Sequence, residues 1–183
     1  MKQRAARQPP PTKLSAPAPH EALEPPKVLG EHEGVKFRRE RLAPILREIQ
    51  PLLKRDWLEN GIDREAAPLE IDFARYLDMD LVGILQIITA RDEELLVGYA
   101  FAYVHPHIDH CGVGWAMLTW YWLFPEYRHA GIGNAMIEAM EGFLREAKVS
   151  VVEVSEKITS KHGLFDRRGY RDVDVVKRKL LES

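Results

Sequence analysis

The sequence predicts one mixed α/β domain that follows a proline-rich arm. Two observations support this prediction. Stretches with apolar residues at helical spacing alternate with short runs rich in β-branched and aromatic residues, and seven of the 12 prolines lie within residues 1–30. The length of 183 residues suits one domain of ordinary size plus a tail.

The arm, residues 1–30, differs from the rest of the chain in charge. It contains five Lys/Arg and two Glu, a net charge of +3, so the other 153 residues have −2 − 3 = −5. Proline favours extended, solvated backbone, and the arm has few apolar residues to bury. We expect a flexible or partner-bound arm, with a leader that has no role as the alternative. Residues 31–183 are expected to form the domain.

The first half of the domain is predicted to contain one strand and two helices. The apolar stretch 35–37 indicates an edge strand. Apolar residues at helical spacing over 42–57 predict an amphipathic helix that Pro51 kinks or splits and Gly61 ends. A second short helix is expected over 72–79, with Asp72 as its N-cap.

The second half is predicted to contain most of the sheet. Residues 85–90 and 95–104 are rich in β-branched and aromatic residues, with a turn between them. A long strand over 113–124 precedes a helix over 131–147 with one apolar stripe. The remaining predictions are a strand over 149–154, a short helix over 160–168, and one or two strands over 170–181.

Composition excludes several classes of protein. Cys111 is the single cysteine, so neither an internal disulfide nor a cysteine-rich zinc module can form. No apolar run approaches the roughly 18–20 residues of a membrane helix, and the start of the chain has no apolar signal region. A net charge of −2 argues against nucleic acid as the main partner. We therefore expect a cytoplasmic protein that binds neither membranes nor nucleic acid.

The strongest chemical signal lies where the long strand meets the long helix. Gly131 and Gly133 stand at the predicted helix start, where backbone N–H groups have no acceptor inside the helix. The helix dipole adds partial positive charge there, and glycine allows close approach of a phosphate. This pattern predicts a diphosphate-binding turn. A plain strand–helix turn that happens to contain two glycines is the alternative.

The segment Arg128-His129-Ala130-Gly131-Ile132-Gly133 resembles the Arg/Gln-x-x-Gly-x-Gly/Ala motif of the GNAT family of N-acetyltransferases. The resemblance covers about residues 33–183. Three pieces, 104–107, 125–128 and 162–170, also resemble phage-encoded GNAT-like proteins. Membership would imply a mixed, mostly antiparallel sheet with helices on both faces. Its fourth and fifth strands, 113–124 and 149–154, would splay apart to admit acetyl-CoA.

The resemblance also implies an activity: transfer of an acetyl group from acetyl-CoA to an amine of a protein or of a small cationic molecule. Main-chain groups near 121–123 would pair with the pantetheine arm, and the amides of 128–134 would hold the diphosphate. The cofactor-binding residues so implied are Leu123, Phe124, Arg128, His129, Ala130, Gly131, Ile132, Gly133 and Asn134.

The catalytic groups depart from the family pattern. The tyrosine that protonates the leaving sulfur in many members corresponds here to Phe165, and the glutamate base of some members corresponds to a place near Met117. Glu153 and Tyr121 are proposed as substitutes, against the alternatives of a surface glutamate and a core tyrosine. A GNAT-fold interaction or assembly protein, associated with a phage virion, is therefore the alternative function.

Two further patterns concern metals and substrates. The string His105-Pro106-His107-Ile108-Asp109-His110 matches a zinc-hydrolase motif, but it falls in a predicted hairpin, so we expect no metal there. Eight acidic residues against two arginines between 56 and 80 suggest a rim that attracts a cationic amine, with an ordinary solvated face as the alternative. Further expected partners are a protein that binds the arm and a second copy of the chain.

Overall fold

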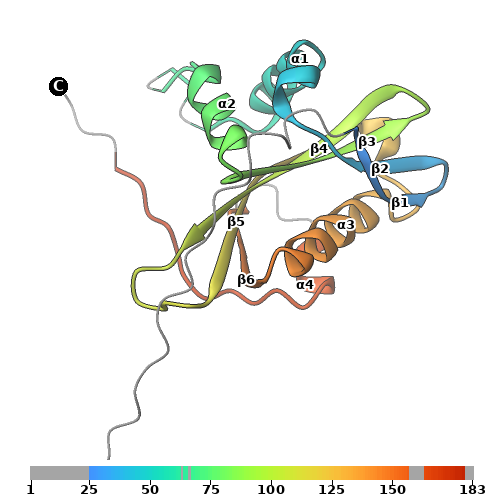
Figure 1. Ribbon diagram of the computed structural model, residues 1–183. Helices are drawn as coiled ribbons and strands as arrows, with labels where there is room; N and C mark the ends of the chain where they lie inside the picture. Colours follow the sequence, from blue (N-terminus) through green and yellow to red (C-terminus); the bar gives the residue numbers. More distant parts are fainter. Residues whose placement is uncertain (1–24, 63, 66, 157–162, 180–183) are drawn as a thin grey trace, which may run out of the picture.

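The structure is a computed structural model that describes residues 25–62, 64–65, 67–156 and 163–179 (Figure 1). Its elements, in chain order, are β1 (Lys27–His32), β2 (Val35–Arg39), α1 (Leu42–Asn60), α2 (Phe73–Leu81), β3 (Leu85–Asp92), β4 (Leu95–Pro106), β5 (Gly114–Leu123), the 3₁₀ turn η2 (Pro125–Tyr127), α3 (Ile132–Glu146), β6 (Val149–Val154) and α4 (Leu164–Arg167).

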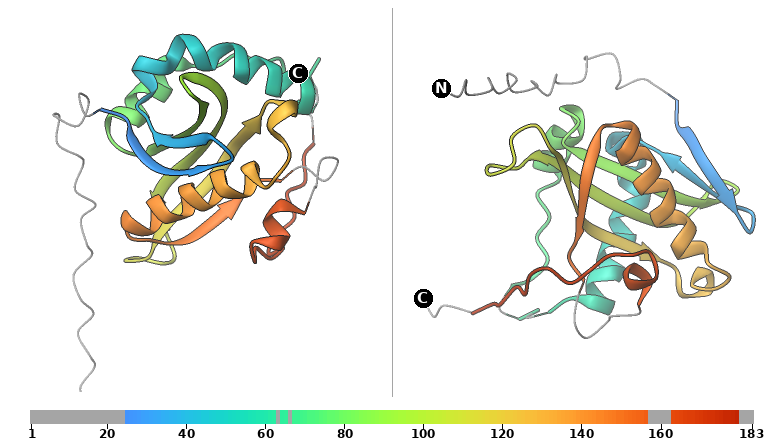
Figure 2. Two further views of the ribbon diagram at one scale, coloured as in Figure 1. Left: turned by 90° about the vertical axis from the view of Figure 1, so that its right-hand side faces the viewer. Right: turned by 90° about the horizontal axis from the view of Figure 1, so that it is seen from below.

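The strands form one sheet in the order β1-β2-β3-β4-β5-β6. Every neighbouring pair is antiparallel except β5 and β6, which are parallel. The parallel pair follows from the chain path, because α3 returns the chain to the same end of the sheet, as a parallel connection requires. Helices α1 and α2 lie over one face and α3 over the other (Figures 1 and 2). The sequence prediction of a mixed, mostly antiparallel sheet with helices on both faces is confirmed.

Strand β4 shows why the domain needs helices on both faces. Seven consecutive residues of this strand are buried, so its side chains require cover on each side. Tyr99 and Phe101 pack under α1 in one core cluster, whereas Ala100 and Ala102 belong to the cluster beneath α3. The small alanines let α3 approach the sheet, and the large aromatic rings fill the wider space under α1.

The start of α1 is capped from a distant part of the chain. Arg41 at the N-cap position makes no side-chain cap, but the Asp80 carboxylate accepts a hydrogen bond from the Leu42 amide at 2.9 Å and pairs with the Arg41 guanidinium at 3.2 Å. Burial raises the pKa of Asp80, while these hydrogen bonds and charges act in the opposite direction. The contact fixes α2 against the start of α1.

Several sequence predictions need correction. The sheet begins at Lys27, before the expected boundary at residue 31, because β1 pairs with β2. Helix α1 continues through Pro51, so the helix is not split there. The strands expected over 170–181 are wrong for residues 170–179, where Val173, Val175 and Val176 are exposed and pair with no strand. Residues 160–162 of the expected last helix lie outside the described residues, and the arm up to residue 24 does as well.

Within the part of the chain that the structure describes, no helix is both long and apolar enough to cross a membrane.

Candidate functional site

Strand β6 accompanies only the first half of β5, and β5 extends beyond its end. They pair over Gly114–Leu118 of β5 and end at the pair Leu118 and Val154. The amide of Ser155 still donates to the carbonyl of Leu118 at 3.2 Å, and beyond this point no described strand pairs with that edge of β5. The open edge spans residues 119–123. The splaying of strands 113–124 and 149–154 stays a prediction, because β6 pairs with β5 up to its own last residue, Val154.

A bulge on the other side of β5 coincides with the end of the β5–β6 ladder. In the ladder with β4, Phe101 pairs with Trp120 while Ala102 pairs with Leu118, so Thr119 is the extra residue. A bulge of this kind bends its strand and increases its twist. The bulge lies directly after Leu118, the last residue of β5 that pairs with β6.

The chain then makes a left-handed turn into α3. Ala130 and Gly131 have φ of +48° and +83°, and Gly131 is the N-cap of α3. The amides of Ile132 and Ala135 donate to the carbonyls of His129 and Gly131 at 3.1 and 3.0 Å. The N–H groups of Gly133 and Asn134 have no carbonyl acceptor within the helix, as is usual for a first turn. They lie just beyond the end of β5 and can hold an anion.

The Arg128 side chain fastens this turn to the far side of the sheet. Its guanidinium makes two contacts with the Glu59 carboxylate in the last turn of α1, the one from Nη2 being 2.7 Å, and Nε donates to the Leu123 carbonyl at 2.9 Å. Trp122 Nε1 also donates to Glu59 at 2.9 Å. The hydrogen bond to Glu59 raises the pKa of Arg128. The side chain of the motif arginine is thus engaged within the protein, and the backbone amides remain for a phosphate.

Two residues that support the turn were not identified from the sequence. Glu59 lies 69 residues before Arg128, and His32 lies 98 residues before Ala130, whose carbonyl is 2.6 Å from His32 Nε2. Neither residue belongs to a recognisable motif, and neither spacing is a local one. Only the assembled sheet brings α1 and the β1–β2 turn to the two sides of residues 128–131.

Tyr121 lies on the α3 face of the open half of β5. Its ring packs edge-on against Phe165 with centroids 4.9 Å apart, and Phe165 is 2% exposed. Tyr170 packs on the other side of Phe165 at 5.2 Å. Burial, and next the charges of Glu156 and Asp56, raise the pKa of Tyr121 above its ordinary value. The Tyr121 hydroxyl therefore keeps its proton at neutral pH.

Glu153 lies on the opposite face of the sheet from Tyr121. Val152 and Val154 of β6 pack in the cluster beneath α3, so Glu153 between them points to the α1 face. In the ladder Glu153 stands beside Met117, the position at which the sequence comparison placed the family's base. The structure therefore does not bring the two candidate catalytic residues together on one face.

Four of the eight acidic residues between 56 and 80 make hydrogen bonds inside the domain. Asp56 accepts from the Tyr99 hydroxyl at 2.9 Å, and Asp72 caps α2 through the Arg75 amide at 3.0 Å. Glu59 and Asp80 make the contacts described above. Asp63 lies outside the described residues. These engagements explain much of the acidic excess without a cationic substrate.

The histidine string forms a ring cluster at the tip of the β4–β5 hairpin. His107 and His110 lie 4.7 Å apart, and Trp115 packs against them at 4.4 and 5.5 Å. Cys111 is exposed beside them. Across the described residues, His, Cys, Asp and Glu side chains form no group of three or more that could hold a metal ion.

Comparisons with known proteins agree with this geometry. The sequence profile of the acetyltransferase (GNAT) family matches residues 46–170, which is more than half of the chain. No curated protein matches the sequence.

Three solved structures illustrate the likeness of fold. An aminoglycoside acetyltransferase from an uncultured soil metagenomic sample, in complex with trehalose, has a TM-score of 0.65 and 18% identity over 81% of this chain and 97% of its own. A predicted acetyltransferase with acetyl-CoA from Clostridium acetobutylicum has a TM-score of 0.65 and 16% identity, over 80% of this chain and 96% of its own. A ribosomal-protein-alanine N-acetyltransferase from Brucella melitensis has a TM-score of 0.63 and 17% identity, over 81% of this chain and 97% of its own.

Proposed function

The chain belongs to the acetyltransferase (GNAT) family, and on that premise we propose that it transfers an acetyl group from acetyl-CoA to an amine. One observation supports the proposal above all others. The edge of β5 over residues 119–123 opens directly before the turn whose amides can hold an anion. A molecule with a diphosphate at one end and a chain of amides at the other is complementary to these two features.

The residues proposed to hold acetyl-CoA lie in two groups. The first is the turn that contains Arg128, His129, Ala130, Gly131, Ile132, Gly133 and Asn134, whose backbone amides would face the diphosphate. The second is the end of β5 with Leu123 and Phe124, whose backbone would lie beside the pantetheine arm in the manner of an added strand. Left-handed backbone at Gly131 suits this role because glycine adopts it without strain.

Acetyl-CoA would supply the acetyl group as a thioester. The transfer forms a C–N bond and breaks a C–S bond, so the departing sulfur gains from a proton and the attacking amine must lose one. Tyr121 is our candidate for the proton donor. It stands on the open half of β5 against Phe165, and its raised pKa keeps the hydroxyl protonated.

Glu153 is our candidate for the group that receives the proton of the amine. Its register beside Met117 supports this assignment, because Met117 corresponds to the family's usual base position. Because Glu153 and Tyr121 lie on opposite faces, the acceptor would approach from the α1 face and the proton for sulfur from the α3 face. A thioester held at the open edge of β5, just beyond the end of β6, would be accessible from both faces.

The solved relatives suggest which acceptor amines to test first. Solved relatives include an aminoglycoside acetyltransferase and a ribosomal-protein-alanine N-acetyltransferase, so a small cationic amine and a protein N-terminus are the two acceptors to test first. The acidic side chains between 56 and 80 favour neither, since four of them are engaged in internal hydrogen bonds.

One observation favours the second candidate function, a GNAT-fold interaction protein without activity. Phe165 fills the position of the usual acid, is 2% exposed and packs between two tyrosines, so the site is lined there by hydrocarbon. In that case acetyl-CoA would bind, or a partner protein would, without turnover.

The experiment that tests the proposal measures CoA thiol release from acetyl-CoA with a panel of aminoglycosides, polyamines and N-terminal peptides. Mass spectrometry of the acceptor identifies the acetylated nitrogen. We expect release that depends on one acceptor class and saturates with acetyl-CoA. Acetyl-CoA that binds but gives no acetylated acceptor across the panel would favour the interaction protein.

A further inference from the structure

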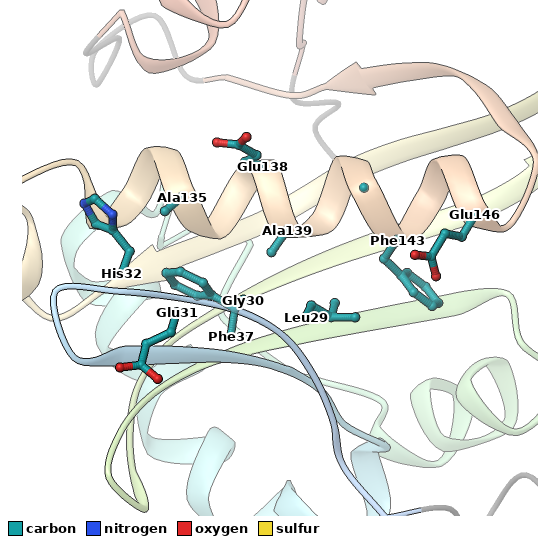
Figure 3. Close-up of a pocket in the computed structure, with 11 residues that line it drawn as sticks. Leu29, Gly30, Glu31, His32, Phe37, Ala135, Glu138, Ala139, Phe143 and Glu146 are labelled. Atoms are coloured by element: carbon teal, nitrogen blue, oxygen red, sulfur yellow. The ribbon is translucent and has the colours of Figure 1, made fainter.

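A groove separates the β1–β2 hairpin from α3 on the side of the molecule away from the open edge of β5 (Figure 3). Its volume is about 360 Å³. Leu29 and Phe37 of the hairpin and Phe143 of the helix lie between the two elements, so the floor is apolar (Figure 3). Three small residues of α3, namely Ala135, Ala139 and Gly142, leave the helix side hollow.

The groove has charges of opposite sign at its two ends. Lys27 pairs with Glu146 at 3.1 Å, and the Arg39 guanidinium lies 4.9 Å above the Phe143 ring, so basic groups occupy the end where β1 begins. Glu31 and Glu138 line the other end and are exposed. Arg168 forms an ion pair with Glu138 at 3.6 Å. The second end therefore has two exposed carboxylates against one arginine and is acidic on balance.

The chain itself contains a segment of matching chemistry. Residues 1–24 include four Lys/Arg and two Glu, and all four basic residues precede both glutamates. Leu14 is one of three large apolar residues in this segment, and it directly follows Lys13. A leucine beside a lysine matches an apolar groove with carboxylates at its rim.

The geometry of attachment also fits. The segment joins the described chain at Pro25, next to the basic end of the groove. Leu14 is 11 residues before Pro25, and an extended chain spans about 3.3 Å per residue, so Leu14 can reach about 36 Å. Strand β1, along which the groove runs, has six residues and a length of about 20 Å. The segment can turn back and lie along the whole groove.

We propose that residues 1–24 dock in this groove of their own chain, with Leu14 on the apolar floor and Lys13 beside Glu31 and Glu138. The docked segment lies between α3 and β1, which is an edge strand of the sheet. His32 lines the groove and also contacts the Ala130 carbonyl, so the docked segment lies against the support of the anion-binding turn.

Spin labelling of the full chain tests the proposal. In a Cys111→Ser background, Ser15→Cys carries a nitroxide, and amide signals of the ¹⁵N-labelled chain are compared with the label oxidised and reduced. We expect strong broadening confined to residues that line the groove. The double substitution Glu31→Gln with Glu138→Gln removes both carboxylates at the rim and should reduce the broadening severalfold. The matched double substitution Glu65→Gln with Glu70→Gln should leave the broadening unchanged.

Two further measurements decide between occupants. In the labelled chain that keeps Glu31 and Glu138, raising the salt to about 1 M should weaken the broadening, because the Debye length falls to about 3 Å. A mixture of ¹⁵N chains without label and ¹⁴N chains with label should show none. Broadening in that mixture would assign the groove to a second copy, and broadening that is absent or spread over the whole domain would show that the segment does not dock there; either result overturns the proposal.

Discussion

Tyr121 is the residue whose surroundings bear most directly on the chemistry. It lies on the open half of β5, its ring touches the residue at the usual acid position, and burial keeps its hydroxyl protonated. The sequence could name Tyr121 as a candidate only because the family resemblance places it beside the expected thioester. Its edge contact with Phe165 depends on α4, which the chain places 44 residues later.

Replacing Tyr121 with Phe removes this hydroxyl and leaves the ring contact. We expect the rate at saturating acetyl-CoA to fall by about 10²-fold or more, since a positioned acid contributes on the order of 10²–10⁴-fold. The affinity for acetyl-CoA should stay the same. Thiol release measured at saturation, with affinity measured by calorimetry, separates the two effects.

Tyr127→Phe is the matched control, because it removes a tyrosine hydroxyl that donates to Asp92 away from Phe165. Phe165→Tyr should preserve or raise the wild-type rate and should restore part of the rate lost in Tyr121→Phe. Equal rates for wild type and Tyr121→Phe would remove Tyr121 from the mechanism.

The pH dependence of the rate follows from the direction of the same shift. Burial raises the pKa of Tyr121 above the ordinary tyrosine value of about 10, so the protonated, donating form persists at and below that pH. We therefore expect that ionisation of Tyr121 causes no loss of the saturated rate below about pH 10. Any loss of rate below that pH should persist in Tyr121→Phe. An alkaline limb centred near pH 8 that disappears in this variant would contradict the assignment.

At the scale of elements, the periodic patterns identified most helices and strands because each buries one face or both. Strand β6 was predicted with its observed bounds, and the Gly131 turn was placed at the start of α3. Strand β1 was missed because KVLGEH has no regular alternation and follows two prolines. The valines after Tyr170 have the spacing of a strand, but they are exposed and pair with no described strand. Strand formation depends on an available partner strand as well as on the residue's own preference.

The contact between α1 and the glycine turn is a link that no local pattern could reveal. Glu59→Gln removes the carboxylate that binds Arg128 and Trp122. Because both charged groups are partly exposed, we expect a loss of only about 1–2 kcal/mol in the free energy of unfolding. We also expect severalfold weaker acetyl-CoA binding, since the turn loses its anchor.

Glu48→Gln is the matched control for this link, because Glu48 is similarly exposed and binds Arg91 of β3 instead of Arg128 of the turn. It should cost comparable stability and leave acetyl-CoA affinity unchanged. Chemical denaturation and calorimetric titration of both variants make the comparison. Loss of affinity in neither variant would show that the Arg128 contact does not position the turn.

At the scale of the whole molecule, the six strands and both core clusters lie within residues 25–179. The composition of the first 30 residues indicated where the domain would begin, but the boundary fell inside a strand. Lys27 to Gly30 pair with β2, and Leu29 packs against the core beneath α3. Charge and proline content cannot show such a boundary, because an edge strand needs few apolar residues.

Two truncations test the boundary. Removal of residues 1–24 should shift the thermal midpoint by only a few degrees, because every core residue of the described chain is kept. Removal of residues 1–30 deletes four residues of β1 and should lower the midpoint clearly further. Differential scanning calorimetry of the two chains provides the measurement. Equal midpoints would mean that β1 contributes nothing to stability.

The central proposal is that acetyl-CoA binds along the part of β5 that extends beyond β6, with its diphosphate on the turn at Gly131. The most direct measurement is calorimetric titration of acetyl-CoA into wild type, Gly131→Ala and Gly112→Ala. Both glycines have positive φ, +83° and +90°, so each alanine introduces strain of about 1 kcal/mol or more. Gly112 lies in the β4–β5 hairpin, remote from the turn.

We expect Gly131→Ala to weaken acetyl-CoA binding at least tenfold, which corresponds to about 1.4 kcal/mol, because relief of the strain turns the amides away from the phosphates. Gly112→Ala should bind acetyl-CoA with wild-type affinity. No binding to the wild-type chain, or equal affinity in all three, would contradict the claim.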